Sequence, residues 1–492
     1  MKNTEALYQQ IHDRLLEEIN AGVYQAGEYL PPLPKICAQF GAGEATARRA
    51  LDMLEQEGFL LYGSNRRYIV HTPVGEEQFT EGYIRRQLSK RTAMADLYEA
   101  VAVLYPRLLI HGLRLCTAEQ LAQLRKICRE MDAWRVPLSQ IAERSLMIYQ
   151  KVVEPLGNPL VTDLFTQVHI FLAIPHVWGC ESLNWIESRY ATTGLEWEER
   201  LSLAEEGRLD EVEKLLADSC WQRRDATDQF IREIAKSLPD RGSRRFSGKE
   251  TAFDWRPGKK KSQLTEVTTD LVGRIMAGDC RKSVYLPSIS EMAAEYGVAR
   301  VTVRQAAERL ERLGLTRFIS PGKIAVVSRE IKKDTAIAHP EIAQLLLTYL
   351  CVLQILADTV DVMVGVIPWT TAPREIDRWE RDCLEAPFSS AQIIFGWIVE
   401  KIPNPTLQMI GQECYQRLSY GYCLAGMMGE EEKRALRTII SEKIRQFAAQ
   451  LRRQDWQGFG SGFARFYQLW FHIARERLAS MEEMHHLAPL PR

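Results

Sequence analysis

The sequence lacks the features that mark several large classes of protein. The formal net charge is −1, so nucleic-acid binding would have to rest on a local motif and not on overall charge. No stretch reaches the roughly 20 apolar residues of a membrane-spanning helix, because the most hydrophobic one, 342–368, is interrupted by Asp358 and Asp361. Residues 1–19 alternate charged and apolar side chains, unlike a signal peptide. We therefore expect a cytoplasmic protein.

Cofactor and metal motifs are also missing. The ten cysteines are scattered without a CxxC pair, which in a large chain without a secretory signal favours free thiols. There is no glycine-rich nucleotide-binding motif, no nucleophile elbow and no cluster of metal ligands. The sequence predicts no enzyme and no cofactor.

What the chain does contain is an internal repeat. Its 492 residues are too many for one hydrophobic core. A shift of 256 positions, which places Gly22 on Gly278, aligns the start of the chain with its second half without a gap. The matches include Tyr29-Leu30-Pro31 with Tyr285-Leu286-Pro287. A second match, Asn158-Pro159 with Asn404-Pro405, needs a shift of 246.

These matches predict a duplicated two-domain unit. We expect winged-helix modules at 1–75 and 263–330, helical domains at 76–240 and 331–480, and a tail at 481–492. Residues 241–262 are glycine-rich and basic and lack apolar periodicity, which predicts an exposed linker. Its run Lys259-Lys260-Lys261 is either a solubilising tether or an arm that contacts phosphates.

The second copy shows the local signals of the module most clearly. Apolar residues at helical spacing run from Leu264 to Ile275, and Ser288 with Glu291 forms a capping-box pattern. A third helix is expected over about 299–313, followed by a hairpin over 315–327. Three helices and a two-stranded wing predict a winged helix-turn-helix. The fold class is therefore mainly α, with two such domains, each followed by an all-helical bundle.

The run YLPSISEMAAEYGVARVTVRQAAERLERLGL resembles the DNA-binding domain of the GntR family of bacterial regulators, and the first copy resembles it more loosely. The resemblance implies that Arg300 and Arg304, which share one face of the third helix, meet bases or phosphates. Thr302 and the wing residue Lys323 are further candidates for DNA contact. The alternative interpretation is that both arginines are ordinary solvated side chains.

The first copy departs from this pattern. Glu44 stands where Arg300 stands in the second copy, and Pro32 replaces the capping serine. Residues 1–75 carry seven basic and nine acidic side chains, against thirteen and eight in residues 257–330. We expect the second module to anchor the complex, because phosphate contacts dominate affinity for DNA. The candidate DNA contacts of the first copy are Thr46, Arg48, Arg49, Arg66 and Arg67.

The helical segments resemble, more weakly, the all-helical effector domain of one GntR subfamily. Many members of that subfamily hold a metal with one aspartate and three histidines. The expected histidine positions carry Tyr149, Trp197 and Phe395, so no metal site is carried over. These three residues either fill the cavity that holds the metal in that subfamily or line an apolar pocket for an organic effector. We expect His111, His169 and His176 to be core residues.

The sequence thus favours a regulator that binds a double-stranded DNA operator under the control of a small organic effector. The alternative is an architectural or protein-interaction factor whose helical domains have lost ligand binding. One chain with two modules is expected to act as a single-chain pseudo-dimer, although a homodimer stays open.

Overall fold

The computed structural model of the chain describes most of its length. The described residues are 2–20, 23–24, 27–63, 67–71, 81–131, 138–172, 193–236, 251–257, 263–277, 285–320, 323–327, 340–426, 428–480 and 490–492. Arg66, His176, Lys259 to Lys261 and most of the expected tail lie outside them.

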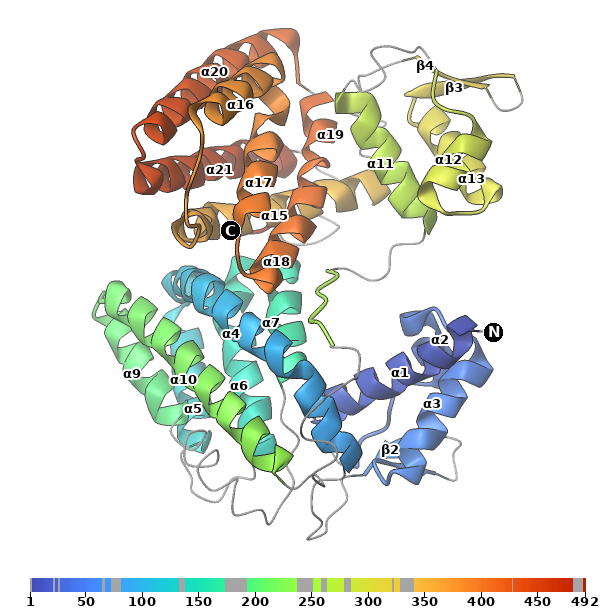
Figure 1. The fold of residues 1–492 in the computed structure, drawn as a ribbon, viewed down its shortest axis with the longest axis vertical. Helices are drawn as coiled ribbons and strands as arrows, with labels where there is room; N and C mark the ends of the chain where they lie inside the picture. The colour runs from blue at the N-terminus through green and yellow to red at the C-terminus, as the bar shows by residue number, and fades with distance from the viewer. Residues whose placement is uncertain are drawn as a thin grey trace. The chain divides into compact units, whose positions relative to one another are not determined.

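The chain divides into two compact units. Unit 1 comprises Met1–Pro155 and Thr162–Trp255, and unit 2 comprises Leu156–Val161 and Arg256–Arg492. Each unit contains one small module with a two-stranded sheet and one bundle of helices (Figure 1). The expectation of a mainly α fold is confirmed.

The first module is a winged helix-turn-helix. Its elements are α1 (Lys2–Asn20), α2 (Leu33–Phe40), α3 (Glu44–Gln56), β1 (Leu60–Tyr62) and β2 (Tyr68–Val70). Apolar side chains at helical spacing on α1 and α3 close over a shared core with α2, which is why these segments fold together. Gly41 ends α2 in the left-handed conformation, with a φ of 60°.

The second module repeats the first almost residue for residue. Its elements are α11 (Gln263–Ala277), α12 (Ile289–Tyr296), α13 (Arg300–Arg312), β3 (Thr316–Ser320) and β4 (Lys323–Val326). The bounds of α12 and α13 equal those of α2 and α3 at the shift of 256. The strand registers agree as well, since Leu60 pairs with Val70 and Thr316 with Val326. The duplication is therefore also a structural one.

One capping difference between the modules follows from the sequence. Ser288 accepts a hydrogen bond from the Glu291 backbone N–H, and the Glu291 side chain accepts one from the Ser288 backbone N–H, so the capping box is present. In the first module Pro32 makes no side-chain cap. The first helix of its helix-turn-helix therefore begins with less support.

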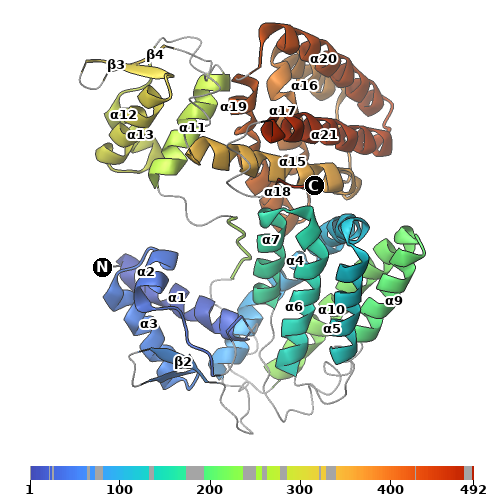
Figure 2. The same ribbon diagram turned by 180° about the vertical axis from the view of Figure 1, so that it is seen from behind.

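The first helical domain is a bundle (Figure 2). Its long helices α4 and α10 lie along each other. The domain consists of α4 (Glu81–Leu115), α5 (Ala118–Met131), α6 (Leu138–Val153), η1 (Glu154–Leu156), α7 (Pro159–Leu172), α9 (Thr193–Glu205) and α10 (Leu209–Ala235).

The second helical domain has a matching order of helices, and here α15 lies along α21. Ala343–Gly365 in α15 is long and apolar enough to cross a membrane, but 83% of its most apolar window is buried within the protein, as in a core helix. The elements are α15 (Pro340–Gly365), α16 (Pro373–Glu385), η4 (Pro387–Ser389), α17 (Ser390–Lys401), α18 (Pro405–Leu418), α19 (Gly421–Gly426), α20 (Glu430–Arg452) and α21 (Trp456–Ala479).

Two landmarks relate the helical domains. Asn158 and Asn404 each cap the helix that follows, with side-chain oxygens that accept backbone N–H groups, and a proline occupies the first helical position. Later in each domain, Gly207 and Gln454 both have positive φ, 77° and 57°, just before α10 and α21. These pairs set the residue correspondence between the domains.

The linker differs from its expectation of an exposed tether. Residues 251–257 form neither helix nor strand. From residue 252 on they alternate between exposed and buried, and Trp255 is only 1% exposed. Its indole N–H donates to Asp163 Oδ2 at 2.9 Å, and the Phe253 ring lies 5.3 Å from the Phe171 ring, centroid to centroid. The aromatic residues in this basic stretch dock it on the first helical domain.

Candidate DNA-binding interface

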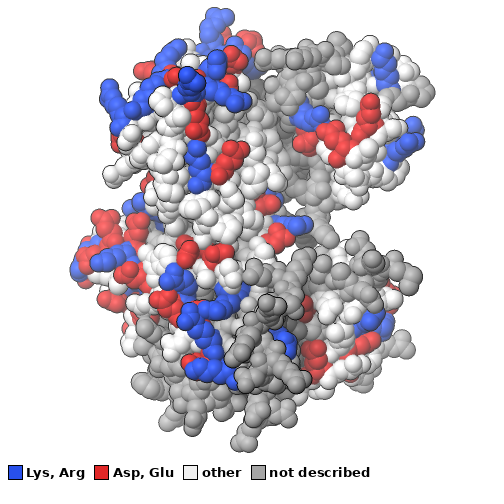
Figure 3. Space-filling model, in the orientation of Figure 1, with Lys and Arg blue, Asp and Glu red and all other residues white. Residues whose placement is uncertain are grey.

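The helix α13 presents a polar face beside a fully buried one. Val303, Ala306, Ala307 and Leu310 are buried against the module core. Arg300 and Arg304, one turn apart, are exposed, whereas Thr302 is half-buried. Among the described residues neither arginine has an ion-pair partner within the chain. Figure 3 shows basic side chains at the outer edge of this module. The predicted reading face is thus accessible and positively charged.

The wing carries a cation that lies over a tyrosine ring in both modules. Lys323 Nζ lies 4.2 Å from the centroid of the Tyr285 ring. At the corresponding position of the first module, the Arg67 guanidinium lies 4.6 Å from the Tyr29 ring. Each tyrosine also forms an isolated bridge to the second wing strand. Cation–π contact holds these cations in place without neutralising them.

On α3 of the first module, Arg48, the equivalent of Arg304, and its neighbour Arg49 are both engaged within the chain. Arg48 Nη2 donates to Glu44 Oε1 at 2.9 Å, an ion pair across one turn. This hydrogen bond raises the pKa of Arg48. The Arg49 guanidinium stacks 3.9 Å from the ring centroid of Tyr8 on α1. Thr46 is half-buried like its counterpart Thr302. The two reading faces therefore differ in available charge as well as in sequence.

A buried histidine ties α1 of the first module to the end of α3. His12, 2% exposed, lies between Asp13 Oδ1 at 3.0 Å and Glu57 Oε2 at 2.9 Å. Burial lowers the pKa of His12, but the hydrogen bonds and charges of the two carboxylates outweigh it and raise the pKa to about 9. His12 is therefore charged at neutral pH. The second module has Thr268 at this position, whose hydroxyl donates to the Leu264 carbonyl.

Comparison with known proteins matches the same two modules. The family described as bacterial regulatory proteins, gntR family, matches the chain twice, at residues 7–70 and 264–320. Both winged-helix modules of the chain are therefore GntR-family domains. The predicted resemblance is thereby confirmed, and the two matches agree with a duplication.

Curated relatives match this chain over one segment. A probable fructoselysine utilization operon transcriptional repressor of Escherichia coli (strain K12) is 37% identical over 57 residues, which are 12% of this chain and 24% of the relative. The protein of the same description from Shigella flexneri gives the same values. The chain thus spans about a quarter of the length of these relatives.

Similar solved structures each align with less than half of the chain. A Listeria monocytogenes structure described as Lar, which controls expression of the agr system, is 14% identical, covers 45% of this chain and 97% of its own, and has a TM-score of 0.22. E. coli McbR/YncC has the same identity and coverage, with a TM-score of 0.25. Streptococcus agalactiae GntR is 18% identical. The alignment covers 47% of this chain and 100% of that structure's chain, with a TM-score of 0.20.

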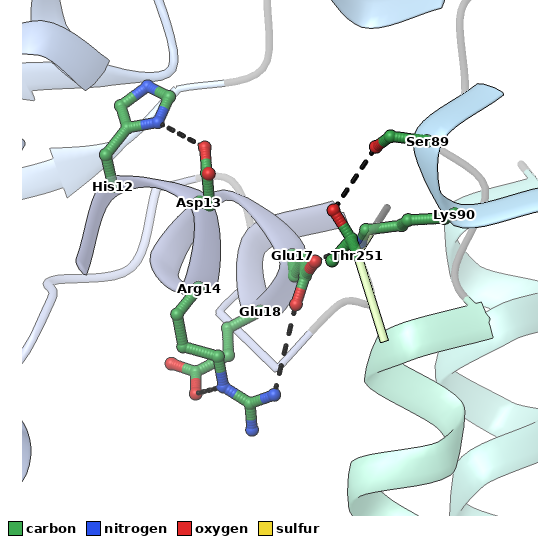
Figure 4. Close-up of polar contacts among 8 residues, drawn as sticks. All are labelled: His12, Asp13, Arg14, Glu17, Glu18, Ser89, Lys90 and Thr251. Carbon is green, nitrogen blue, oxygen red and sulfur yellow. Dashed lines mark hydrogen bonds and ion pairs between the residues drawn. The ribbon is translucent and has the colours of Figure 1, made fainter. Parts of the chain in front are cut away.

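Within unit 1, a polar seam joins the first GntR module to its helical domain (Figure 4). Lys90 on α4 forms an ion pair with Glu17 on α1, and Arg14 donates to the amide oxygen of Gln167 on α7. Ser89, next to Lys90, is 3.2 Å from the hydroxyl of Thr251 in the docked linker. The DNA-binding module, two bundle helices and the linker therefore meet at one place.

Two of the effector candidates lie together inside the first helical domain. Tyr149 on α6 meets Trp197 on α9 edge to face, with centroids 5.5 Å apart. Tyr149 also lies 5.7 Å from Phe165 on α7, which stacks on Tyr105 of α4 at 3.8 Å. Arg223 on α10 donates to the Tyr149 hydroxyl at 2.8 Å. The resemblance to the effector-domain subfamily pointed to Tyr149 and Trp197, and the structure makes them neighbours.

Sequence reasoning missed the charged part of this cluster. Arg200 is 2% exposed, its guanidinium carbon lies 5.3 Å from the Trp197 ring centroid, and it donates to Glu196 Oε2 at 3.1 Å. Burial, followed by the nearby charge of Arg223, lowers the pKa of Arg200. The one available signal was an arginine on the apolar face of α9, three residues after Trp197.

The third effector candidate has different surroundings. Phe395 on α17 is fully buried and packs edge to face on Tyr467. With the correspondence set by Gly207 and Gln454, Arg200 falls on Phe447 and Arg223 on Trp470. The second domain thus replaces the charged cluster of the first by aromatic rings. In unit 2 a small cavity of about 30 Å³ lies beside Trp470.

Proposed function

We propose that this GntR-family chain is a cytoplasmic, sequence-specific transcription regulator that binds double-stranded DNA through α13. The exposed pair Arg300 and Arg304 on a winged-helix module of a known regulator family carries this proposal. Arginines in the first turns of such a helix reach guanine edges and phosphates in the major groove. Thr302 and Lys323 support the backbone contacts.

Selection of bound DNA from a random pool tests this proposal and gives the operator. On the selected DNA, Arg304→Ala should lower affinity about tenfold or more. Arg465→Ala is the matched control, because Arg465 is an exposed arginine on α21 of the same unit. Equal effects of the two substitutions, or recovery of no preferred sequence, would contradict specific binding through α13.

We infer that the first module contributes less affinity than the second. The Glu44 carboxylate neutralises Arg48, so α3 offers less charge to phosphates. Arg48→Ala should therefore weaken operator binding less than Arg304→Ala. A larger loss from Arg48→Ala would reverse the ranking. Because the copies are unequal, the operator should depart from a perfect palindrome.

We further propose that the first helical domain binds a small organic effector at the Tyr149 and Trp197 cluster. Among the described residues, Trp197 Nε1 and Arg200 Nε are buried without a hydrogen-bond partner. The Tyr105 hydroxyl is also buried without a hydrogen-bond partner among the described residues. Leaving such a group unsatisfied costs about 1–3 kcal/mol. All three are donors, so the effector is expected to present oxygen acceptors.

The polar seam connects the helix α7, which contributes Phe165 to this cluster, with α1 of the DNA-binding module. Phe165, which stacks in the cluster, lies two residues before Gln167, which accepts the hydrogen bond from Arg14 of α1. A ligand that moves Phe165 therefore acts on α7 next to that contact. Gln167→Ala should leave effector affinity unchanged and reduce the effect of the effector on operator binding.

A thermal-shift screen with organic acids and phosphorylated sugars tests the effector proposal, since a ligand of the folded state raises the unfolding midpoint. Arg200→Met should abolish a shift seen with the wild type, whereas Phe395→Leu in the second domain should keep it. If no compound shifts the midpoint, the alternative of a factor with scaffold-only helical domains is favoured.

We propose that one chain supplies both modules for one operator, as a single-chain pseudo-dimer. The support is the duplication itself, because regulators with one module per chain need two chains to cover two half-sites. Light scattering of the purified protein should give the 56.4 kDa mass of one chain. A stable mass of twice that value would show a homodimer with four modules instead.

A further inference from the structure

The reading face of α13 carries an apolar side chain that the fold does not use. Val301, the second residue of the helix, is 61% exposed, the highest exposure among the large hydrophobic residues of the described part of the chain. Val303, two residues later, is fully buried in the module core. The core therefore does not account for a valine at position 301.

Local helix stability does not account for this valine either. A β-branched residue in the first turn loses side-chain freedom and is a weaker helix former than the alanine found at the corresponding position, Ala45. Its exposed methyl groups also stay in contact with water in the free protein. The exposed valine is therefore available to an apolar partner outside the chain.

The neighbours of Val301 indicate what that partner is. Arg300, Arg304 and Gln305 are exposed on the same side of α13. In the major groove, arginine pairs with guanine and glutamine with adenine, while the one apolar group on a base edge is the C5 methyl of thymine. A valine between such side chains meets that methyl group when the helix enters the groove.

We propose that Val301 is a specificity-determining residue that packs against the C5 methyl of a thymine in the half-site of the second module. The proposal rests on the proposed DNA-binding function and names one base that α13 reads. Ala45 presents a single methyl group at this position of the first module. The two modules therefore differ in preference at the corresponding base pair.

Replacing thymine by deoxyuridine tests the proposal, because uracil has the same hydrogen-bonding edge without the methyl group. The operator is selected from a random pool, and the half-site of the second module is identified by the base preferences that Arg304→Ala relaxes. Each thymine of that half-site is then replaced in turn. Wild-type protein should bind one of these DNAs about threefold to fivefold more weakly, the effect of losing one buried methyl contact.

The variant Val301→Ser should bind the operator with thymine and the operator with uracil at that position with nearly equal affinity. Leu195→Ser, which removes a similarly exposed apolar side chain from α9, should keep the wild-type difference. The proposal is overturned if the half-site contains no thymine, if no thymine position responds to uracil, or if Val301→Ser responds as the wild type does. Each of these outcomes leaves sequence-specific DNA binding intact. Failure to select any DNA would instead overturn the proposed function.

Discussion

The ion pair between Glu44 and Arg48 predicts that removing one carboxylate strengthens DNA binding. Both side chains lie on the outer face of α3, 48% exposed for Arg48 and 69% for Glu44, and their charged atoms are 2.9 Å apart. In Glu44→Gln the carboxylate is replaced by a neutral amide of the same shape. Arg48 is then free to meet a phosphate, as we propose for Arg300 and Arg304 in the second module.

The size of the effect follows from counterion release. One added phosphate contact steepens the dependence of log K on log salt by about 0.9. If the contact gains its affinity from this release alone, Glu44→Gln should bind about 15-fold more tightly at 50 mM salt and about fourfold more tightly at 200 mM. Fluorescence anisotropy with the selected operator, read at several salt concentrations, measures both the gain and its slope.

Two controls separate this cause from a general change in charge. Glu28→Gln removes the same charge from an exposed position of the same module outside α3, and should change affinity by less than about twofold. In the Arg48→Ala background, Glu44→Gln should give little gain, because no arginine remains to be released. The reasoning is refuted if Glu44→Gln gains no more than Glu28→Gln, or if its gain does not fall with salt.

Three further substitutions test the fold. Because the folded-state pKa of His12 is raised, to about 9, its charge stabilises the module fully below pH 6.5 and this contribution is lost as pH rises through 9. His12→Gln should therefore cost on the order of 2 kcal/mol at pH 6 and little at pH 10, measured by chemical unfolding. Gln454→Gly should stabilise the protein by about 0.5–1 kcal/mol, since glycine tolerates the positive φ of this position, and Gln454→Ala should not. Trp255→Ala should cost about 3–5 kcal/mol and expose the linker to proteolysis, whereas the half-exposed Trp221→Ala should not.

Local signals were enough to predict the winged-helix modules. Apolar spacing predicts α13, the Ser288 capping box predicts the start of α12, and Gly297 predicts its end, because each signal acts within one or two turns. The position of the reading face follows from the same periodicity. The placement of the Arg49 side chain does not, since its stacking on Tyr8 depends on how α1 packs against α3.

Contacts between distant segments account for what the sequence did not predict. Trp255 is buried against α7, 92 residues earlier in the chain, although the glycines and basic residues before it are typical of an exposed linker. The burial of Arg200 depends on α10, where its guanidinium contacts Ser219 and Leu215. Neither contact leaves a periodic signal, so each could be found only from the fold.

Duplication within one chain explains how the two copies came to differ at matched positions. In a homodimer each substitution appears on both sides of the two-fold axis, so Glu44 would weaken both half-site contacts at once. In one chain, the first copy can carry Glu44 and a buried Arg200 while the second keeps Arg300 and fills its core with Phe447. Under the proposed function, affinity for DNA and binding of an effector can then change independently. This separation is a reason for selection to retain two unequal copies in place of two identical chains.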